Sequence, residues 1–271
     1  MALRMGKRKQ PTREEKQIKY ALKITDRVLD DQTTHTLAML MNAKEFRNID
    51  YAVSQGKEAV VFRATCHDGS FRAVKVFKFE TTAFRKMVPY IEGDPRFNVD
   101  AVKHSKRALV KVWTRKEYAN LSACAHAQVS VPQPFAMKEN VIVMEFIGVE
   151  GKPCALLQEV VVQNPEVVFK QLLGEMRKMH SAGIVHGDLS PYNVMLLQKE
   201  NEDGSFEEKA FVIDLAQGVS LKHPKAREFL ERDVANVVHF FSKLGVENEL
   251  CDGKKALEFI LGEGKKAKVR F

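Results

Sequence analysis

The stretch that decides the fold is VHGDLSPYN, residues 185–193, together with Ile213-Asp214-Leu215 further along the chain. Asp188 stands five residues before Asn193, and Asp214 comes where the second strand of a β pair would end. This spacing brings three oxygen-bearing side chains around one phosphate group. Asp188 can orient an attacking group and accept its proton, while Asn193 and Asp214 can bind Mg²⁺, which prefers hard oxygen ligands. A loop with a capping aspartate would explain one such motif, but not the spaced pair.

A lysine and a glutamate far apart in sequence fit the same kind of site. Alternation along a strand places Lys75 on the face of Ala73 and Phe77. In the predicted helix 105–127, every fourth residue forms an apolar stripe that includes a carboxylate: Leu109, Trp113, Glu117 and Leu121. An unpaired charge is costly in either position, and a Lys75–Glu117 ion pair like that of protein kinases removes both costs. The alternative is a surface lysine and a glutamate at the edge of the stripe.

The predicted phosphate-covering loop is SQGKEA, residues 54–59. Conventional protein kinases have three glycines here, in the pattern G-x-G-x-x-G. This chain retains Ser54, Gly56 and Lys57, which we expect to approach phosphates through backbone N–H groups and one positive charge. Taken alone, the loop is weak support for nucleotide binding.

Hydrophobic periodicity predicts helices and short strands in a definite order. Residues 12–45 read as helical, with Thr12 as the cap, and Asn164 is predicted to cap a later helix. The expected strands are 59–64, 72–77, 141–147, 194–197 and 210–213, with turns at 67–70 and 201–205, and the expected helices are 105–127, 164–182, 225–243 and 254–262.

This order predicts an α+β fold with two lobes and a hinge near 145–151. A basic helical extension would occupy residues 1–45. A strand-rich front lobe would follow over 46–148, with an inserted loop near 80–104 that is rich in charge, proline and glycine. A reduced helical rear lobe with a basic tail would occupy 149–271.

Composition and cysteine usage narrow the class of protein. A chain of 271 residues with 45% hydrophobic and 29% charged residues can bury a proper core. Its four cysteines form no C-x-x-C pair, which argues against a zinc site or a disulfide framework. The apolar stretch 141–148 contains Glu145 and is too short to span a bilayer, and the N-terminus lacks the apolar core of a signal peptide. We expect a cytoplasmic protein with no membrane partner.

Positive charge gathers in three places. The net charge is +8, and residues 1–23 carry eight Lys/Arg against two Glu. The tail 265–270 adds four more basic residues, and another group lies on or beside the helix 105–127: Lys103, Lys106, Arg107, Lys111, Arg115 and Lys116. Such a charge distribution attracts polyanions such as RNA. The alternative is that these are solvated faces and tails, since no RNA-binding motif with stacking aromatic residues is visible.

The combination of motifs resembles one family, the RIO family of atypical kinases. The motifs are SQGKEAVVF, AVKVF, WTRKEYANL, VSVPQP, VIVMEFIG, VHGDLSPYNVML, FVIDLAQGV and ERDVANVVHFF. They match the shorter, archaeal type of the first RIO branch best, over roughly residues 45–245. The resemblance implies a protein-kinase-like fold with ATP and Mg²⁺ as cofactors, and Mn²⁺ as a substitute for Mg²⁺.

The resemblance also implies roles for individual residues. Lys75 would position ATP with Glu117 as its partner, and Ser54, Gly56 and Lys57 would form the phosphate loop. Glu145 and Ile147 would contact adenine. Asp188 would be the catalytic base, with Asn193 and Asp214 as metal ligands. Asp214 would also be a candidate for transient phosphorylation, so that the enzyme behaves as an ATPase in maturation of the small ribosomal subunit.

Departures from the expected patterns limit this reading. Gly187 and Pro191 replace an Ala and a Glu of the family motif, at positions that supply no ligand. Ser190 stands where conventional protein kinases have a Lys near the transferred phosphate, a feature shared by the RIO family. No A-P-E motif follows Asp214, and little chain remains for an activation loop and peptide-binding helices.

Two alternative functions remain open at this point. One is a small-molecule kinase of the aminoglycoside or choline kinase type, which shares the H-G-D-x-x-P-x-N loop but needs a larger rear lobe. The other is a ribosome-binding scaffold whose ATP site only fixes a conformation. The favoured function is a RIO-type serine/threonine-protein kinase that acts largely as an ATPase. Its expected partner is the immature small ribosomal subunit or its RNA. We expect no DNA partner.

Overall fold

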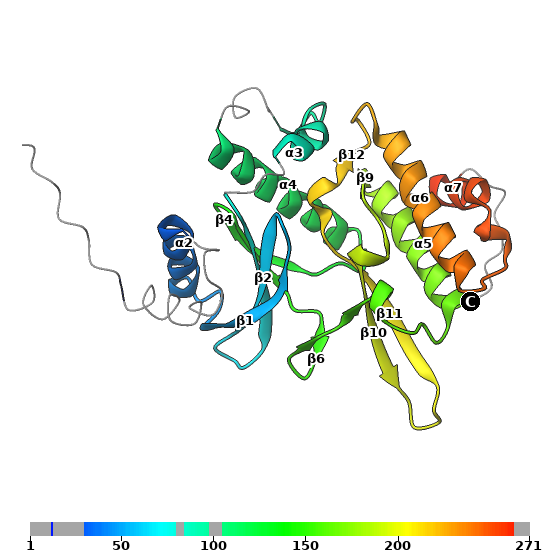
Figure 1. Cartoon of the computed structure of the whole chain (residues 1–271), viewed down its shortest axis with the longest axis horizontal. Helices are drawn as coiled ribbons and strands as arrows, with labels where there is room; N and C mark the ends of the chain where they lie inside the picture. Colours follow the sequence, from blue (N-terminus) through cyan, green and yellow to red (C-terminus); the bar gives the residue numbers. More distant parts are fainter. Residues whose placement is uncertain (1–11, 13–29, 80–83, 98–104, 263–271) are drawn as a thin grey trace, which may run out of the picture.

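The computed structural model describes residues 12, 30–79, 84–97 and 105–262 (Figure 1). Its front half is a five-stranded antiparallel sheet in the order β1-β2-β3-β5-β4. The strands are β1 (Asn48–Gln55), β2 (Ala59–Thr65), β3 (Phe71–Phe77), β4 (Pro134–Lys138) and β5 (Val141–Glu145). Helix α2 (Asp31–Asn42) lies on one side of this sheet and α4 (Lys106–His126) on the other.

The two faces of β3 bury different side chains, because successive residues of a strand point in opposite directions. Val74 and Val76 belong to the apolar cluster that includes Leu37 of α2. Ala73 and Phe77 belong to the larger cluster on the α4 side. Lys75 therefore lies on the α4 side of the sheet, as the alternation predicted.

Helix α4 carries the predicted apolar stripe. Leu109, Trp113 and Leu121 are buried in the larger core cluster. Glu117 lies on the same stripe and is only 1% exposed. The helix thus places one carboxylate in the interior, directly behind the sheet.

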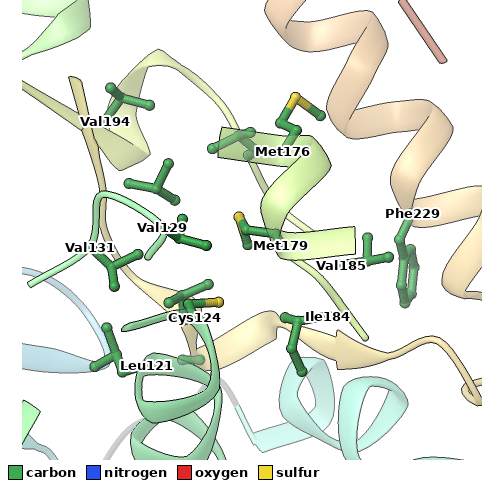
Figure 2. Close-up of a cluster of buried hydrophobic side chains, with 14 of the residues drawn as sticks. Leu121, Cys124, Val129, Val131, Met176, Met179, Ile184, Val185, Val194 and Phe229 are labelled. Carbon is green, nitrogen blue, oxygen red and sulfur yellow. The ribbon is translucent and has the colours of Figure 1, made fainter. Parts of the chain in front are cut away.

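The rear half consists mainly of three helices, α5 (Pro165–Ser181), α6 (Ala226–Lys243) and α7 (Gly253–Leu261) (Figure 1). Its core is continuous with that of the front half. Figure 2 shows Met176 and Met179 of α5 above Leu121 and Cys124 of α4, with Val185 nearby. Apolar burial therefore ties α4 to both halves of the molecule.

Short elements between these helices form the region that contains the predicted motifs. In chain order they are β6 (Gly148–Val149), β7 (Lys152–Pro153), β8 (Ala155–Leu156), η1 (Leu157–Glu159), β9 (Ile184–Val185), η2 (Pro191–Asn193), β10 (Val194–Glu200), β11 (Phe206–Val212), η3 (Leu215–Gln217), β12 (Val219–Ser220) and η4 (Glu249–Cys251). β10 pairs with β8 and β11, and β9 pairs with β12. These pairings bring the segments before and after residues 186–214 side by side.

The prediction of an unstructured loop over 80–104 is wrong in part. Residues Phe84–Ile91 form helix α3, with Met87 and Ile91 buried. The apolar residues Phe84, Met87, Val88 and Ile91 follow helical spacing, but Pro89 inside that pattern suggested a loop. The remaining parts of the insertion, 80–83 and 98–104, lie outside the described residues.

Other local predictions also need correction. Strands β1 and β4 were not predicted. Asn164 precedes α5, but its side chain donates to the carbonyl of Phe206 instead of capping the helix. The described part of the first predicted helix begins at Asp31, where Asp30 accepts a hydrogen bond from the Thr33 N–H at 2.8 Å. Residues 13–29 of the predicted helix lie outside the described residues, as do residues 1–11 of the basic extension and the tail from 263 onward.

Within the described ranges, no helix combines the length and apolar character needed to cross a membrane. The division of the chain at residues 45 and 148 remains a prediction.

Candidate active site

Three charged side chains meet between the sheet and the short elements. Lys75 Nζ lies 2.7 Å from Glu117 Oε1 and 2.9 Å from Asp214 Oδ1. Lys75 and Glu117 are buried, whereas the side chain of Asp214 is 49% exposed. One ammonium group therefore forms ion pairs with two carboxylates, one buried inside the protein and one accessible to solvent.

The charges of this group depend on one another. Burial alone lowers the pKa of Lys75, but the charges of Asp214 and Glu117 outweigh it and raise that pKa above its ordinary value. Burial also raises the pKa of Asp214, yet Lys75 reverses the shift, so that this carboxyl has a lowered pKa. Glu117 has a pKa raised to about 7, because burial and the charge of Asp214 outweigh the attraction of Lys75. Its Oε2 atom is buried and has no hydrogen-bond partner among the described residues.

The loop with Asp188 is fixed by backbone and side-chain contacts. His186 is buried, and its Nε2 lies 3.0 Å from the carbonyl of Ile213, just before Asp214. Gly187 has φ +79°, a left-handed conformation that favours glycine. Asn193 Nδ2 donates to the carbonyl of Asp188 at 2.8 Å. His186 therefore braces the loop against the segment that leads into Asp214.

Asp214 begins a tight turn. Its backbone is left-handed, with φ 61° and ψ 65°, which is uncommon for a residue other than glycine. The turn continues through η3, where Gln217 Nε2 donates to Asp188 Oδ2 at 2.9 Å. Asp188 is thus attached to the turn that begins at Asp214. From η3 the chain passes through β12 into α6.

The environment of Asp188 favours its protonated form more than water does. Burial raises the pKa of Asp188, and the nearby charge of Asp214 adds to this effect. His186, Arg232 and the hydrogen bond from Gln217 oppose the shift without cancelling it. A carboxylate with a raised pKa is a better proton acceptor than an ordinary aspartate.

Helix α6 supplies contacts that the predicted site did not include. Asp233 accepts hydrogen bonds from the N–H groups of Gly187 and Leu189, each at 2.8 Å. Asn236 donates to the carbonyl of Leu189 at 3.0 Å, and Arg232 donates to the carbonyl of Gly187. The signal was available in the sequence, because Asp233 falls on the apolar stripe of α6 just as Glu117 does on that of α4.

The phosphate loop differs from expectation in one respect. Ser54 is exposed near the end of β1, and Gly56 and Lys57 are exposed in the turn between β1 and β2. The Gly56 N–H already donates to the carbonyl of Ala59 at 2.9 Å, and the Gly56 carbonyl accepts from Lys78 at 2.7 Å. The Gly56 N–H is therefore used inside the turn, which leaves the Lys57 charge as the more available phosphate contact.

The predicted adenine-contacting residues lie where β5 leaves the sheet. The Glu145 carboxylate accepts from the Gln133 N–H at 3.1 Å, so this side chain is held against the neighbouring strand. The carbonyl of Ile147 accepts from the Cys154 N–H at 3.0 Å. The adenine-contacting roles of Glu145 and Ile147 stay predictions.

Asn193 and Asp214 fit a magnesium ion. Because Asn193 Nδ2 is engaged by the Asp188 carbonyl, its Oδ1 atom is the one that can bind a cation. Asp214 adds an ionised and accessible carboxylate. Among the described residues no cluster of three or more His, Cys, Asp or Glu side chains forms a metal cage. Two oxygen ligands completed by phosphate and water are the usual arrangement for Mg²⁺ in phosphoryl transfer.

The predicted basic face on α4 needs correction. Lys116 is fully buried, and its Nζ donates to the carbonyls of Ala216 and Gly218. Arg107 forms an ion pair with Asp30, and Lys111 forms one with Glu139. Lys103 lies outside the described residues. Lys116, Arg107 and Lys111 are thus engaged within the fold, so the group contributes less free positive charge than the sequence suggested.

The fold and the site together define a protein-kinase-like phosphotransferase. A family model for the RIO domain matches residues 60–254. The chain belongs to the RIO family of serine/threonine-protein kinases. It has the two-lobed kinase fold with a reduced rear lobe that the sequence predicted.

Curated relatives are similar over most of the chain. The RIO-type serine/threonine-protein kinase Rio1 of Haloferax volcanii is 40% identical over 89% of this chain and 78% of its own length. The protein of the same name from Thermoplasma acidophilum is 41% identical over 74% of this chain and 98% of its own length. The prediction of an archaeal type of the first RIO branch agrees with both.

Solved structures support the fold. The Rio2 kinase of Chaetomium thermophilum, in an ADP/Mg²⁺-phosphoaspartate complex, is 21% identical with a TM-score of 0.65, covering 82% of this chain and 65% of that one. A second structure of the same kinase has a TM-score of 0.64 at 18% identity, covering 95% of this chain and 92% of that one.

Proposed function

We propose that this RIO-type kinase binds ATP with Mg²⁺ and acts largely as an ATPase whose turnover switches its association with immature small ribosomal subunits. The observation that carries the proposal is the position of Lys75 between Glu117 and Asp214, with Asp188 linked to the same turn through Gln217. A buried cation with one inner and one accessible carboxylate is the arrangement that kinases use to place ATP phosphates.

Each residue has a part in this proposal. Lys75 binds phosphate oxygens of ATP while Glu117 keeps its ammonium group in place. Asn193 and Asp214 hold Mg²⁺, for which Mn²⁺ can substitute, and the bound ion neutralises charge that develops on the phosphates. Asp188 accepts the proton of the attacking group. Lys57 approaches the phosphates from the loop above, and the backbone at Glu145 and Ile147 receives adenine.

Asp214 is also the proposed first acceptor of the phosphoryl group. A carboxylate oxygen of Asp214 forms a bond to the γ-phosphorus as the bond from that phosphorus to the β–γ bridging oxygen breaks, and ADP leaves. Water then attacks the phosphorus, Asp188 takes its proton, and inorganic phosphate leaves with the Asp214 carboxylate restored. Carboxylates form such intermediates in other ATPases. The Rio2 complex described above contains phosphoaspartate, and we extend that chemistry to this chain as part of the proposal.

A cavity beside Gln217 offers room for a larger acceptor. This cavity of about 630 Å³ is lined by Gln217 together with Tyr90, Trp113, Phe229 and Arg232. Since Gln217 contacts Asp188, an acceptor hydroxyl at Asp188 would extend into this space. Protein phosphorylation is therefore compatible with the site, although Ser190 stands where conventional kinases have a lysine.

The ribosomal partner is proposed from charge. The net charge of +8 includes eight Lys/Arg in residues 1–23 and four in 265–270, a distribution that suits ribosomal RNA. As part of the same proposal, the protein acts in the cytoplasm. A scaffold with a structural ATP site is less well supported, because Lys75, Glu117, Asp188, Asn193 and Asp214 are all present.

A single-turnover reaction with γ-labelled ATP tests the mechanism. After quenching, the labelled protein is divided between acid and hydroxylamine, which releases acyl phosphate but not phosphate on serine or threonine. We expect hydroxylamine-sensitive label that maps to Asp214 and is absent from the Asp214→Asn variant. Label on serine or threonine alone would contradict the aspartyl-phosphate step, and absence of both label and hydrolysis would favour the scaffold.

A further inference from the structure

The turn that carries Asp214 is held by two buried side chains of α4. Asn120 Nδ2 donates to the carbonyls of Leu215 and Gly218, at 2.9 and 2.7 Å. Lys116 Nζ donates to the carbonyl of Ala216 at 3.0 Å and also to that of Gly218. Both side chains are fully buried, so no water competes for these carbonyls. The contacts fix the backbone directly after the candidate metal ligand.

Asn120 and the turn are in direct contact. A Cβ atom at Gly218 would lie 2.8 Å from Asn120 Nδ2 and 3.0 Å from the carbonyl oxygen of Leu215. Real Cβ atoms avoid such distances, so the amide of Asn120 occupies the space that a side chain at Gly218 would need. Any rotation of this amide therefore changes the turn.

The orientation of Asn120 depends in turn on Arg96. Arg96 NH1 donates to Asn120 Oδ1 at 2.9 Å, which forces the amide nitrogen toward the turn. The other guanidinium nitrogens, Nε and NH2, donate to Asp94 at 2.9 and 2.7 Å. Asp94 is itself only 2% exposed, and its pKa is lowered because the hydrogen bonds from Arg96 outweigh the effect of burial. Only a planar fork of donors can reach both partners at once.

We propose that Arg96 is a positioning residue for the active site: by fixing Asn120 it sets the position of the Asp214 turn. That turn carries Asp214, the proposed magnesium ligand and phosphoryl acceptor, and Gln217, which donates to Asp188. The guanidinium of Arg96 donates to Asp94 and Asn120, and its contact with the Asp214 turn runs through Asn120. The magnesium-dependent part of this inference rests on the proposed function, whereas the effect on the turn does not.

The inserted region thereby becomes part of the site. Asp94 and Arg96 follow α3 in the segment that was predicted as a loop. Asp94 Oδ2 also lies 3.5 Å from the N–H of Ser220 in β12, at the far end of the turn. One short stretch of the insertion thus contacts both α4 and the strand that leaves the turn. A displacement of this stretch would therefore shift the turn that carries Asp214.

The alternative is that Arg96 only provides the counterion for Asp94, whose side chain is buried. In that case any residue at position 96 that keeps the positive charge would leave the turn unchanged. The variant Arg96→Ala removes the contact with Asn120, and Arg96→Lys retains a positive charge beside Asp94 without the fork. Arg227→Ala is the control for loss of an exposed arginine, since Arg227 pairs with Glu231 on the exposed side of α6.

The first readout uses the protein without nucleotide or metal. Amide hydrogen exchange of the peptide covering 213–221 should be roughly 10–100-fold faster in Arg96→Ala, since hydrogen bonds to charged groups contribute that much to local opening. Arg96→Lys should behave like Arg96→Ala, and Arg227→Ala like the wild type. Exchange over β2 and β3 should stay unchanged in all of them. Unchanged exchange over 213–221 in Arg96→Ala, or full rescue by Arg96→Lys, would overturn the proposal.

The second readout is the Mg²⁺ concentration needed for half-maximal ADP binding, measured by calorimetry. Residues that fix a metal ligand typically contribute about 10–100-fold to metal affinity. We expect a shift of that size in Arg96→Ala, with ADP affinity in the absence of Mg²⁺ within about twofold of wild type. Equal loss of ADP affinity with and without Mg²⁺ would indicate a general structural defect and contradict a specific positioning role.

The two readouts separate this inference from the proposed function. If the wild type binds no Mg²⁺-dependent ADP, the proposed function fails, while hydrogen exchange still decides whether Arg96 holds the turn. If the wild type binds Mg²⁺ and ADP but Arg96→Ala is unchanged in both readouts, the inference fails and the proposed function stands.

Discussion

At the scale of single residues, Lys75 has the most demanding environment. It forms ion pairs with the accessible Asp214 and with Glu117, whose buried Oε2 atom has no hydrogen-bond partner in the described part of the chain. Its position followed from two periodicities, one along a strand and one along a helix. The third partner, Asp214, was predicted as a metal ligand but not as a contact of Lys75, because sequence spacing alone does not show how a turn returns to the sheet.

Removal of the Lys75 ammonium group should impair nucleotide binding. In Lys75→Ala, Glu117 becomes a buried carboxylate without a counterion, a change that typically costs about 3–5 kcal/mol of stability. We expect weaker ATP binding and slower turnover, with Glu117→Ala showing the same defects to a smaller extent. Lys170→Ala is the control, since Lys170 pairs with Glu166 on the exposed surface of α5. Calorimetry and hydrolysis assays measure both effects, and equal ATP affinity in all three variants would exclude a kinase-like nucleotide site.

Protonation of Asp188 should make turnover decrease at acidic pH. Its pKa is raised, chiefly by burial, so the base loses its proton only at a pH above the ordinary range of an aspartate. Turnover should therefore fall as the pH is lowered through this raised pKa. Asp188→Asn should reduce turnover by about 10²–10⁴-fold and leave ATP binding intact. A pH–rate profile of the wild type beside the variant checks this, and a variant with wild-type turnover would exclude Asp188 as the base.

At the scale of elements, α6 holds the loop that contains Asp188. Asp233 accepts the N–H groups of Gly187 and Leu189 with different oxygens, so Asp233→Asn replaces one acceptor with a donor facing a donor. We expect a loss of about 1–3 kcal/mol in stability at neutral pH, together with reduced turnover. Asn236→Ala is a useful comparison, because it removes one contact to the same loop without creating a donor clash.

The stability difference between the wild type and Asp233→Asn should depend on pH in a definite direction. Burial raises the pKa of Asp233 to about 6, above that of an unfolded aspartate near 4. A raised folded pKa means that the stability contributed by this group is greatest at low pH and is lost as the pH rises through about 6. The stability difference between wild type and Asp233→Asn should therefore shrink from pH 4.5 to 7.5 in denaturant titrations. A difference that grows over this interval would contradict the assigned direction.

Elements with strong periodicity could be predicted, and those fixed by tertiary contacts could not. Helices α4 and α5 follow clear apolar stripes, and β2 and β3 alternate. Strand β1 has a single fully buried residue, Ile49, and α3 contains Pro89. The buried position of Lys116 was not predictable from charge patterning, because its partners are backbone carbonyls of a distant turn. The motif residues were found because their spacing reflects a local loop geometry.

At the scale of the whole molecule, positive charge is concentrated toward the ends of the sequence. Residues 1–23 carry eight Lys/Arg and two Glu, a net +6 of the total +8. Lys116, Arg107 and Lys111 are engaged within the fold, so the α4 group adds less to an RNA-binding surface. The terminal segments should therefore dominate any electrostatic attraction to RNA.

Binding to small ribosomal subunits or their RNA should accordingly fall steeply with salt. Each phosphate neutralised contributes roughly 0.7–0.9 to the slope of log K against log salt concentration. A variant without residues 1–23 should show a clearly shallower slope, because it lacks most of the net charge. The double variant Lys254→Gln and Lys255→Gln in α7 is the control for a smaller loss of exposed charge, and its slope should remain close to that of the wild type. Filter binding over a salt series measures the slopes. Tight binding that is insensitive to salt would mean that the basic segments contact solvent and not RNA phosphates. A ribosomal partner would then need a docking surface on the folded part of the chain.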